Sequence, residues 1–115
     1  METKRIIRTT AYTIMSEIGE AELLAFIRRT FVVNLFSSHD FIKSFVAHYS
    51  VEYERMQDVC AEYGDICYRR KMIANAIGRY LGNHCDRLCI EKVGIERSKN
   101  INETMSSATV WRIIL

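Results

Sequence analysis

Four cysteines are the side chains in this sequence best suited to hold a metal. Cys85 and Cys89 are four residues apart, which places both thiols on one face of a helix, and Cys60 and Cys67 lie on either side of Gly64. If a helical hairpin at Gly64 brings the two pairs together, four thiolates could hold a zinc ion. Neither pair forms the tight knuckle of most structural zinc sites, and free cysteine is commonly buried. We therefore expect core cysteines, with no metal and no cofactor.

Arg79 and His84 form a second candidate site, because four residues separate them. An imidazole can move a proton near neutral pH and a guanidinium can hold a phosphate. The spacing resembles the Arg-x4-His motif of the HEPN ribonucleases, small all-helical toxins that act on RNA at a dimer interface. The resemblance implies that Arg79 and His84 are catalytic residues. It covers only one helix end, where Tyr80 replaces a polar residue and Gly82-Asn83 interrupts the helix.

Basic side chains gather between residues 69 and 99, directly after an acidic block over residues 52–65. A basic surface attracts the phosphates of nucleic acids. The candidate nucleic-acid-binding residues of this region are Arg69, Arg70, Lys71, Arg79 and Arg87. The alternative is that the two blocks are solvated faces of neighbouring helices that attract each other.

The C-terminal segment over residues 105–114 looks like the recognition helix of a helix-turn-helix protein. In such helices a serine caps the start, small and hydroxyl residues meet DNA, and apolar residues anchor the helix. The resemblance implies that Ser107, Thr109 and Arg112 read DNA. The gap from Gly94 to Ser106 is longer than the usual tight turn. The alternative is an apolar C-terminal helix or short edge strand that docks on the rest of the domain.

Large aromatic residues are candidates for contact with a protein partner. Tyrosine, tryptophan and phenylalanine dominate the centres of protein interfaces, and this chain has six, one and five of them. Tyr49, Tyr53 and Trp111 are the candidate partner-binding residues. Tyr49 and Tyr53 belong to an aromatic stripe from Phe41 to Tyr63, which is typical of a core face, with an exposed partner groove as the alternative.

The composition sets the class of fold. The chain has 115 residues, of which 49% are hydrophobic, with five glycines and no proline. This is enough apolar material for one core, and too few turn-forming residues for an all-β fold. The chain carries no secretory leader pattern and no stretch of about 18 uncharged apolar residues. We therefore expect a cytoplasmic protein with reduced thiols and no membrane contact.

The most regular pattern in the chain runs from Phe41 to Tyr63 in steps of three and four residues, and it predicts one continuous helix over 40–63. The other predicted elements are helices over 4–18, 20–36, 66–81 and 84–93, a polar linker over 95–104 and a C-terminal segment over 106–115. Together they predict a single all-α domain over residues 1–115. Its architecture would be a small bundle of four to five antiparallel helices.

The function predicted from these features is that of a non-enzymatic cytosolic binding or regulatory protein. It would act through protein–protein contacts and self-associate. The alternative is a nucleic-acid-binding regulator that uses the basic 69–99 region and the helix-turn-helix-like C-terminus. A lesser alternative is a HEPN-like ribonuclease. The chain has no Gly-rich phosphate loop, no His-Glu-x-x-His pattern and no paired-carboxylate signature, which favours a protein that is not an enzyme.

Overall fold

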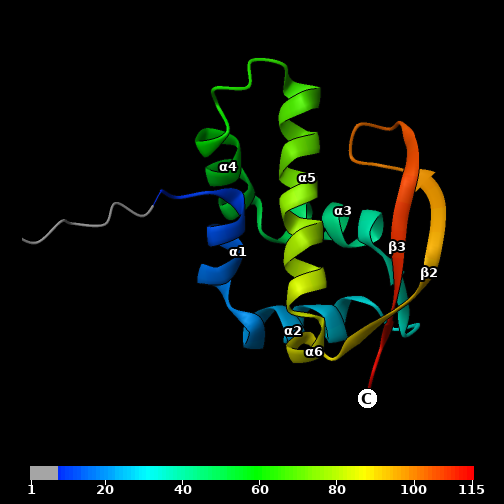
Figure 1. Ribbon diagram of the computed structural model, residues 1–115. Helices are drawn as coiled ribbons and strands as arrows, with labels where there is room; N and C mark the ends of the chain where they lie inside the picture. The colour runs from blue at the N-terminus through cyan, green and yellow to red at the C-terminus, as the bar shows by residue number, and fades with distance from the viewer. Residues whose placement is uncertain (1–7) are drawn as a thin grey trace, which may run out of the picture.

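The computed structural model describes residues 8–115, and residues 4–7 of the predicted N-terminal helix lie outside this range. The elements, in chain order, are α1 (Ala11–Ile18), α2 (Glu20–Thr30), β1 (Leu35–Ser37), α3 (Ser38–His48), α4 (Ser50–Val59), α5 (Ile66–Asn83), α6 (Cys85–Leu88), β2 (Ile90–Lys99) and β3 (Met105–Ile113). The strands form one antiparallel sheet in the order β1-β3-β2. The fold is therefore mixed α/β, and the prediction of an all-α helical bundle is wrong (Figure 1).

Polar side chains cap three of the helices at their first turns. Thr10, Ser37 and Asp65 precede α1, α3 and α5, and each accepts hydrogen bonds from amides of the first turn. These amides have no partner within the helix, so the caps stabilise the helix starts. Gly19, with φ of 91°, separates α1 from α2 in a conformation that side chains with a Cβ rarely adopt.

The predicted continuous helix over 40–63 is wrong, because the chain breaks at Tyr49 between α3 and α4. Tyr49 has φ of −106° and ψ of 50°, outside the helical region. Its ring packs 5.1 Å from the ring centroids of both Phe26 and Phe45, and its hydroxyl donates to Glu22 Oε1 at 2.8 Å. The expectation that the aromatic stripe is buried is confirmed at this point: Phe45 has no exposed surface and Tyr49 is 8% exposed.

The last quarter of the chain differs most from the sequence-based expectation. α6 covers only four residues and ends at Cys89, which takes the left-handed conformation with φ of 54°. β2 and β3 then form an antiparallel hairpin around a turn at residues 100–104. The recognition helix over 105–114 is therefore wrong, and the strand that was the alternative is present. The predicted helix over 84–93 is helical only over Cys85–Leu88, and the predicted linker over 95–104 is a strand up to Lys99. β3 is also not an edge strand, because it lies in the middle of the sheet.

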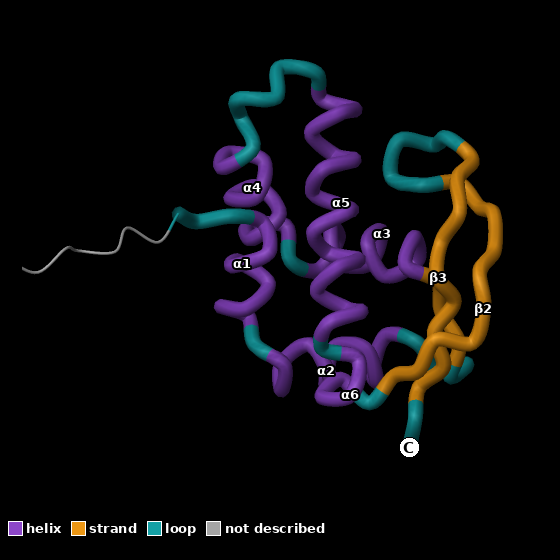
Figure 2. Tube along the Cα trace, viewed as in Figure 1, coloured by secondary structure: helices purple, strands orange, loops and turns teal. Residues whose placement is uncertain are grey.

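The sheet and the helices share one apolar core. α5 runs through the middle of the molecule, with α1 and α4 on one side and the sheet on the other (Figures 1 and 2). Phe36 of β1, together with Trp111 and Ile113 of β3, belongs to the same buried cluster as the helical rings. Trp111 also donates its indole N–H to Ser38 Oγ at 3.1 Å, which joins the hairpin to the start of α3. The hairpin is thus part of the core that positions α5.

Candidate functional site

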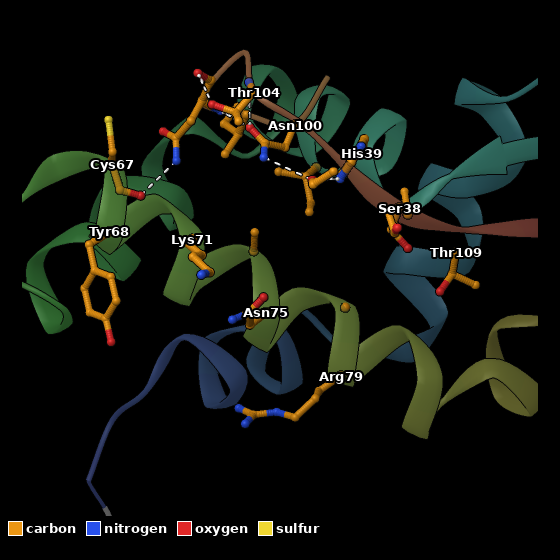
Figure 3. A pocket seen from close by; sticks show the side chains of 18 of the residues that line it. Ser38, His39, Cys67, Tyr68, Lys71, Asn75, Arg79, Asn100, Thr104 and Thr109 are labelled. Carbon is orange, nitrogen blue, oxygen red and sulfur yellow. Dashed lines mark hydrogen bonds between the residues drawn. The ribbon is translucent and has the colours of Figure 1, made fainter. Parts of the chain in front are cut away.

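A groove of about 880 Å³ lies between α5, the first turn of α3 and the β2–β3 hairpin (Figure 3). Its volume lies within the range of pockets that bind ligands. α5 forms one wall with Lys71, Asn75 and Gly78, and the hairpin forms the facing wall with residues that include Ser107 and Thr109. The groove therefore brings one face of a helix and one strand, β3, together with the hairpin turn against the same space.

The groove wall on α5 is the solvent-facing side of an amphipathic helix. Lys71, Asn75 and Arg79 are exposed at four-residue steps, while Ile73 and Ile77 on the opposite side are fully buried. Asp65, at the start of the same wall, accepts hydrogen bonds from the amides of residues 67 and 68. Its carboxylate is therefore committed to capping α5. The remaining charged side chains that α5 gives to the groove, Lys71 and Arg79, are both cationic.

His39 lies at the base of the groove, between α3 and the hairpin. Its two ring nitrogens form hydrogen bonds with Ser98 Oγ at 2.7 Å and Ser106 Oγ at 3.2 Å. The side chain is only 8% exposed, and burial lowers the pKa of His39. The nearby positive charge of Lys43 acts in the same direction. The imidazole is therefore neutral near pH 7. Its two hydrogen bonds join α3 to both β2 and β3.

The hairpin turn closes one end of the groove. Within the turn, Asn100 Oδ1 accepts hydrogen bonds from the amides of Asn102 and Thr104 at 2.9 and 3.2 Å. Asn102 Nδ2 then donates to the backbone carbonyl of Cys67 at 2.8 Å. This last contact ties the hairpin to the first turn of α5, so the two walls keep a fixed separation at this end.

The structure brings Arg79 and His84 close to the same side chain, Tyr12. Arg79 lies at the rim of the groove, with its guanidinium carbon 6.0 Å from the Tyr12 ring centroid. His84 Nδ1 lies 2.9 Å from a carboxylate oxygen of Glu20, and its Nε2 lies 3.1 Å from the Tyr12 hydroxyl. The ring also stacks on Tyr80 at 4.0 Å. Both nitrogens of His84 are thus engaged within the chain, outside the groove.

The predicted nucleic-acid-binding residues divide into two groups. Those that line the groove are Lys71, Arg79, Ser107 and Thr109. The others lie elsewhere: Arg69 donates to the carbonyl of Tyr63 at 3.1 Å, Arg70 lies near Tyr53, Arg87 is exposed on α6, and Arg112 Nε donates to Glu91 at 2.7 Å. The basic cluster at residues 69–71 therefore splits around α5, and only its lysine faces the groove.

Two of the three predicted partner-binding aromatics, Tyr49 and Trp111, are buried, and the third, Tyr53, is half-buried. Burial raises the pKa of Tyr49 to about 12, and its hydrogen bond to the Glu22 carboxylate acts in the same direction. The Tyr53 hydroxyl is buried without a hydrogen-bond partner among residues 8–115, and burial raises its pKa. Trp111 is 5% exposed. Tyr49 and Trp111 are thus buried in this conformation, while Tyr53 is half-buried.

The four cysteines are free thiols in separate surroundings. Cys67 is exposed near the closed end of the groove, and Cys60, Cys85 and Cys89 are partly buried. Burial raises the pKa of Cys60, which keeps that thiol protonated. In the described part of the chain, no three side chains of histidine, cysteine, aspartate or glutamate come close enough to hold a metal ion together.

His39, Asn75 and Gly78 are among the groove residues that the sequence did not predict. Asn75 and Gly78 carried a signal, because both disfavour the interior of a helix and both fall on the exposed face of the predicted helix over 66–81. His39 carried none, because its neighbours Ser98 and Ser106 are far away in sequence and reach it only through the fold.

Comparison of the chain with models of known protein families, with curated proteins and with solved structures finds no match. Among residues 8–115, no helix combines the length and the apolar character that crossing a membrane requires. The site itself therefore has to support any functional proposal.

Proposed function

We propose that this protein binds double-stranded nucleic acid through the groove-facing side of α5 and the adjacent hairpin. The observation that carries the proposal is the row of Lys71, Asn75 and Arg79, which are exposed at four-residue steps beside strand β3, which contributes Ser107 and Thr109. The major groove of B-form DNA accepts an α-helix or a two-stranded ribbon. Here α5 is the helix exposed at this surface, and β3 lies beside it.

The side chains of this row match the chemistry of a duplex. An asparagine on a helix can form two hydrogen bonds with adenine, and lysine or arginine can bind guanine or a phosphate. The hydroxyls of Ser107 and Thr109 can donate to phosphate oxygens, which position a protein on the backbone. Asn75 is thus the candidate for base reading, and Lys71 and Arg79 are candidates for phosphate or guanine contact.

Gly78 supports the close approach of a large ligand to α5. A glycine in a helix interior costs about 1 kcal/mol relative to alanine. Packing within the described residues does not require this glycine, because a Cβ atom added there would meet no atom within 4 Å apart from its chain neighbours and the backbone of its own helix. Gly78 lines the groove on the same wall as Asn75. A ligand surface that approaches the α5 backbone closely at this position explains why the residue is a glycine.

The arrangement of α3 and α5 adds a likeness in shape. In helix-turn-helix proteins one helix crosses the DNA backbone while a second enters the major groove. α3 lies across α5 in Figure 1, and α4 separates them in the chain. Shared shape does not establish function, so the proposal rests on the α5 side chains.

Binding to a fluorescent duplex, measured by anisotropy across a salt series, tests the proposal. We expect Lys71→Glu to weaken binding and to reduce the slope of log affinity against log salt by about 1. Asn75→Ala should cost about 1–3 kcal/mol on preferred sequences and relax the preference. Arg28→Glu on α2 is the matched control, because it makes the same change in net charge at an exposed residue outside the groove.

Two outcomes would overturn the proposal. One is duplex binding that responds equally to Lys71→Glu and Arg28→Glu, because the effect would then come from overall charge. The other is a failure to bind duplexes at low salt, whether or not the protein binds single strands. Circular dichroism of each variant establishes that it is folded.

A further inference from the structure

A row of hydrogen bonds joins α1, α2 and the end of α5 on the α1 side of α5 (Figure 1). Tyr12 lies in the first turn of α1, Glu20 is the first residue of α2, and His84 directly follows α5. His84 Nδ1 lies 2.9 Å from Glu20 Oε2, and His84 Nε2 lies 3.1 Å from the Tyr12 hydroxyl. A hydroxyl, an imidazole and a carboxylate therefore follow one another at hydrogen-bond distance.

The order of these groups sets the direction in which a proton can move. An ionised carboxylate only accepts hydrogen bonds, so the His84 nitrogen beside Glu20, Nδ1, carries a hydrogen. In the neutral imidazole, Nε2 is then the acceptor, and it faces the Tyr12 O–H. A nucleophile, a base and a carboxylate that orients the base form the arrangement that activates weak nucleophiles in enzymes of unrelated folds. His84 can therefore take the proton of Tyr12, and Glu20 can stabilise the imidazolium that forms.

Two further side chains can stabilise negative charge on the Tyr12 oxygen. Asn83 Nδ2 donates a hydrogen bond to this oxygen at 3.1 Å, and the guanidinium carbon of Arg79 lies 6.0 Å from the centroid of the Tyr12 ring. Tyr80 packs edge-on against the same ring at 5.3 Å, which holds its orientation. Donors and cations that are fixed in advance act on the charge that develops during a reaction.

The groups around the Tyr12 hydroxyl are open to solvent. The side chains of Glu20 and His84 are 38% and 29% exposed, and Asn83 and Arg79 are exposed. Pairs of side chains this accessible contribute little to stability, so the fold does not depend on their alignment. A substrate can reach these groups without any opening of the core.

Arg79 indicates the class of substrate. A guanidinium binds a phosphate group through two parallel hydrogen bonds, and Arg79 also lies at the rim of the groove proposed to bind a duplex. One side chain thus connects that groove with Tyr12. We infer that Tyr12 is a nucleophile that attacks a phosphodiester of the bound nucleic acid, with His84 as its general base and Glu20 as a positioning residue. The choice of nucleic acid as the substrate rests on the proposed function, whereas the activation of Tyr12 rests on its own contacts.

The step transfers a phosphoryl group and involves no oxidation or reduction. The Tyr12 O–H bond breaks, and its proton moves to His84 Nε2 while the oxygen attacks phosphorus. The new bond from Tyr12 to phosphorus replaces the bond to one ester oxygen, which leaves with its electron pair. The leaving oxygen takes a proton from the solvent, to which the imidazolium loses its own. The products are a phosphotyrosyl link to one part of the strand and a free hydroxyl on the other part.

An activated phosphodiester, bis(p-nitrophenyl) phosphate, tests Tyr12 without any need for duplex binding. Its reaction with the full chain should release a burst of p-nitrophenolate and leave a nitrophenyl phosphoryl group on the peptide that contains Tyr12, detected by mass spectrometry. Tyr12→Phe, which keeps the ring and its packing, should abolish both signals. His84→Gln should slow the reaction by about 10²–10⁴-fold. Tyr63→Phe is the matched control, because it also removes a phenol hydroxyl, but one that has no histidine partner among residues 8–115.

Glu20→Gln separates a positioning role from a structural one. Glutamine keeps an oxygen that can accept from His84 Nδ1, but it removes the negative charge. The side chains that face His84 are Glu20 from α2, Tyr12 from α1 and Tyr80 from α5, whose ring stacks at 4.0 Å. Without the carboxylate the imidazolium releases its proton more readily, so the rise of the rate with pH should move to lower pH while the maximum rate falls. A purely structural role would lower the rate at every pH without that displacement.

A labelled duplex that carries a nick, so that short released fragments diffuse away, tests the substrate. The wild type should form a labelled band that survives denaturing electrophoresis, and Tyr12→Phe should not. A duplex that binds but forms no such band, although bis(p-nitrophenyl) phosphate modifies Tyr12, would refute nucleic acid as the substrate.

Two results with bis(p-nitrophenyl) phosphate would overturn the nucleophile itself. One is a Tyr12 peptide that stays unmodified, and the other is a rate that is unchanged in His84→Gln. Either result leaves duplex binding, which anisotropy measures, unaffected. Modification of Tyr12 in a protein that binds no duplex would instead refute the proposed function and the choice of substrate, and it would support the activation of Tyr12.

Discussion

The helical core and the outer half of the hairpin are held together by different interactions. In the core, rings pack on rings: Phe26 lies 5.8 Å from Phe41, and both are almost fully buried. In the outer hairpin, hydrogen bonds dominate. The His39 ring forms them with Ser98 and Ser106, and the side-chain amide of Asn102 donates one to the backbone carbonyl of Cys67 in α5. The outer hairpin therefore buries less apolar surface than the core, so substitutions of its exposed residues should cost less stability. A surface of this kind can carry binding residues without endangering the fold.

The largest effect should follow from Phe45→Ala in the core. Phe45 has no exposed surface and contacts Phe41 and Tyr49. Removing its ring leaves a cavity, so the free energy of unfolding should fall by about 3–5 kcal/mol. Urea denaturation measures the loss, with Phe45→Leu as a milder control. A loss below about 1 kcal/mol would show that the rings do not provide the main stability of the helical side.

An intermediate effect of opposite sign is expected at the groove wall. Gly78→Ala should raise the free energy of unfolding by about 0.5–1 kcal/mol, because alanine favours the helix and the added Cβ meets open space. The same variant should weaken duplex binding if a ligand approaches the α5 backbone closely. Denaturation and anisotropy on one preparation measure both. Stabilisation with unchanged binding would remove Gly78 from the proposed contact surface.

The smallest effect should come from acidification, because it acts on one side chain, His39. Burial lowers the pKa of His39 below its usual value of 6.5, so in this range the unfolded chain binds more protons than the folded one. The stability present above pH 6.5 should therefore decrease as the pH falls toward the folded-state pKa.

The measurement compares denaturation at about pH 7.5 and about pH 5 for the wild type and His39→Gln. The variant should lose the part of the pH dependence that belongs to this residue, while other titrating groups contribute equally to both proteins. Identical pH profiles would mean that the environment of His39 does not oppose its protonation.

Much of the helical side could be predicted from the sequence. Apolar periodicity predicts the starts of α2 and α5 correctly, although the helix from residue 20 ends at Thr30 and not at residue 36. The N-terminal helix, predicted over 4–18, ends where expected at Ile18 but begins only at Ala11 within the described residues. These signals are local, because each backbone N–H of a helix donates a hydrogen bond to the carbonyl four residues earlier in the chain. The break at Tyr49 was not predictable, because it depends on Glu22 and Phe26 from another helix.

The strands and half of the groove could not be predicted either, because they too depend on contacts between residues that are far apart in the sequence. β2 is polar along most of its length, and β3 begins with small hydroxyl residues that suit a helix start equally well. Only pairing with distant residues makes them strands. Lys71 and Arg79 were found from their charge, Ser107 and Thr109 were found but assigned to a helix, and His39 was missed.

The position of β3 in the middle of the sheet affects the order in which the chain can fold during its synthesis. Phe36 of β1 is made early, yet its neighbour in the sheet, Trp111, is among the last described residues to leave the ribosome. β1 and β2 are not neighbours in the sheet, since each pairs with β3. Closing so long a segment of chain is slow compared with helix formation. The nascent chain therefore carries an incomplete sheet until translation reaches its final strand.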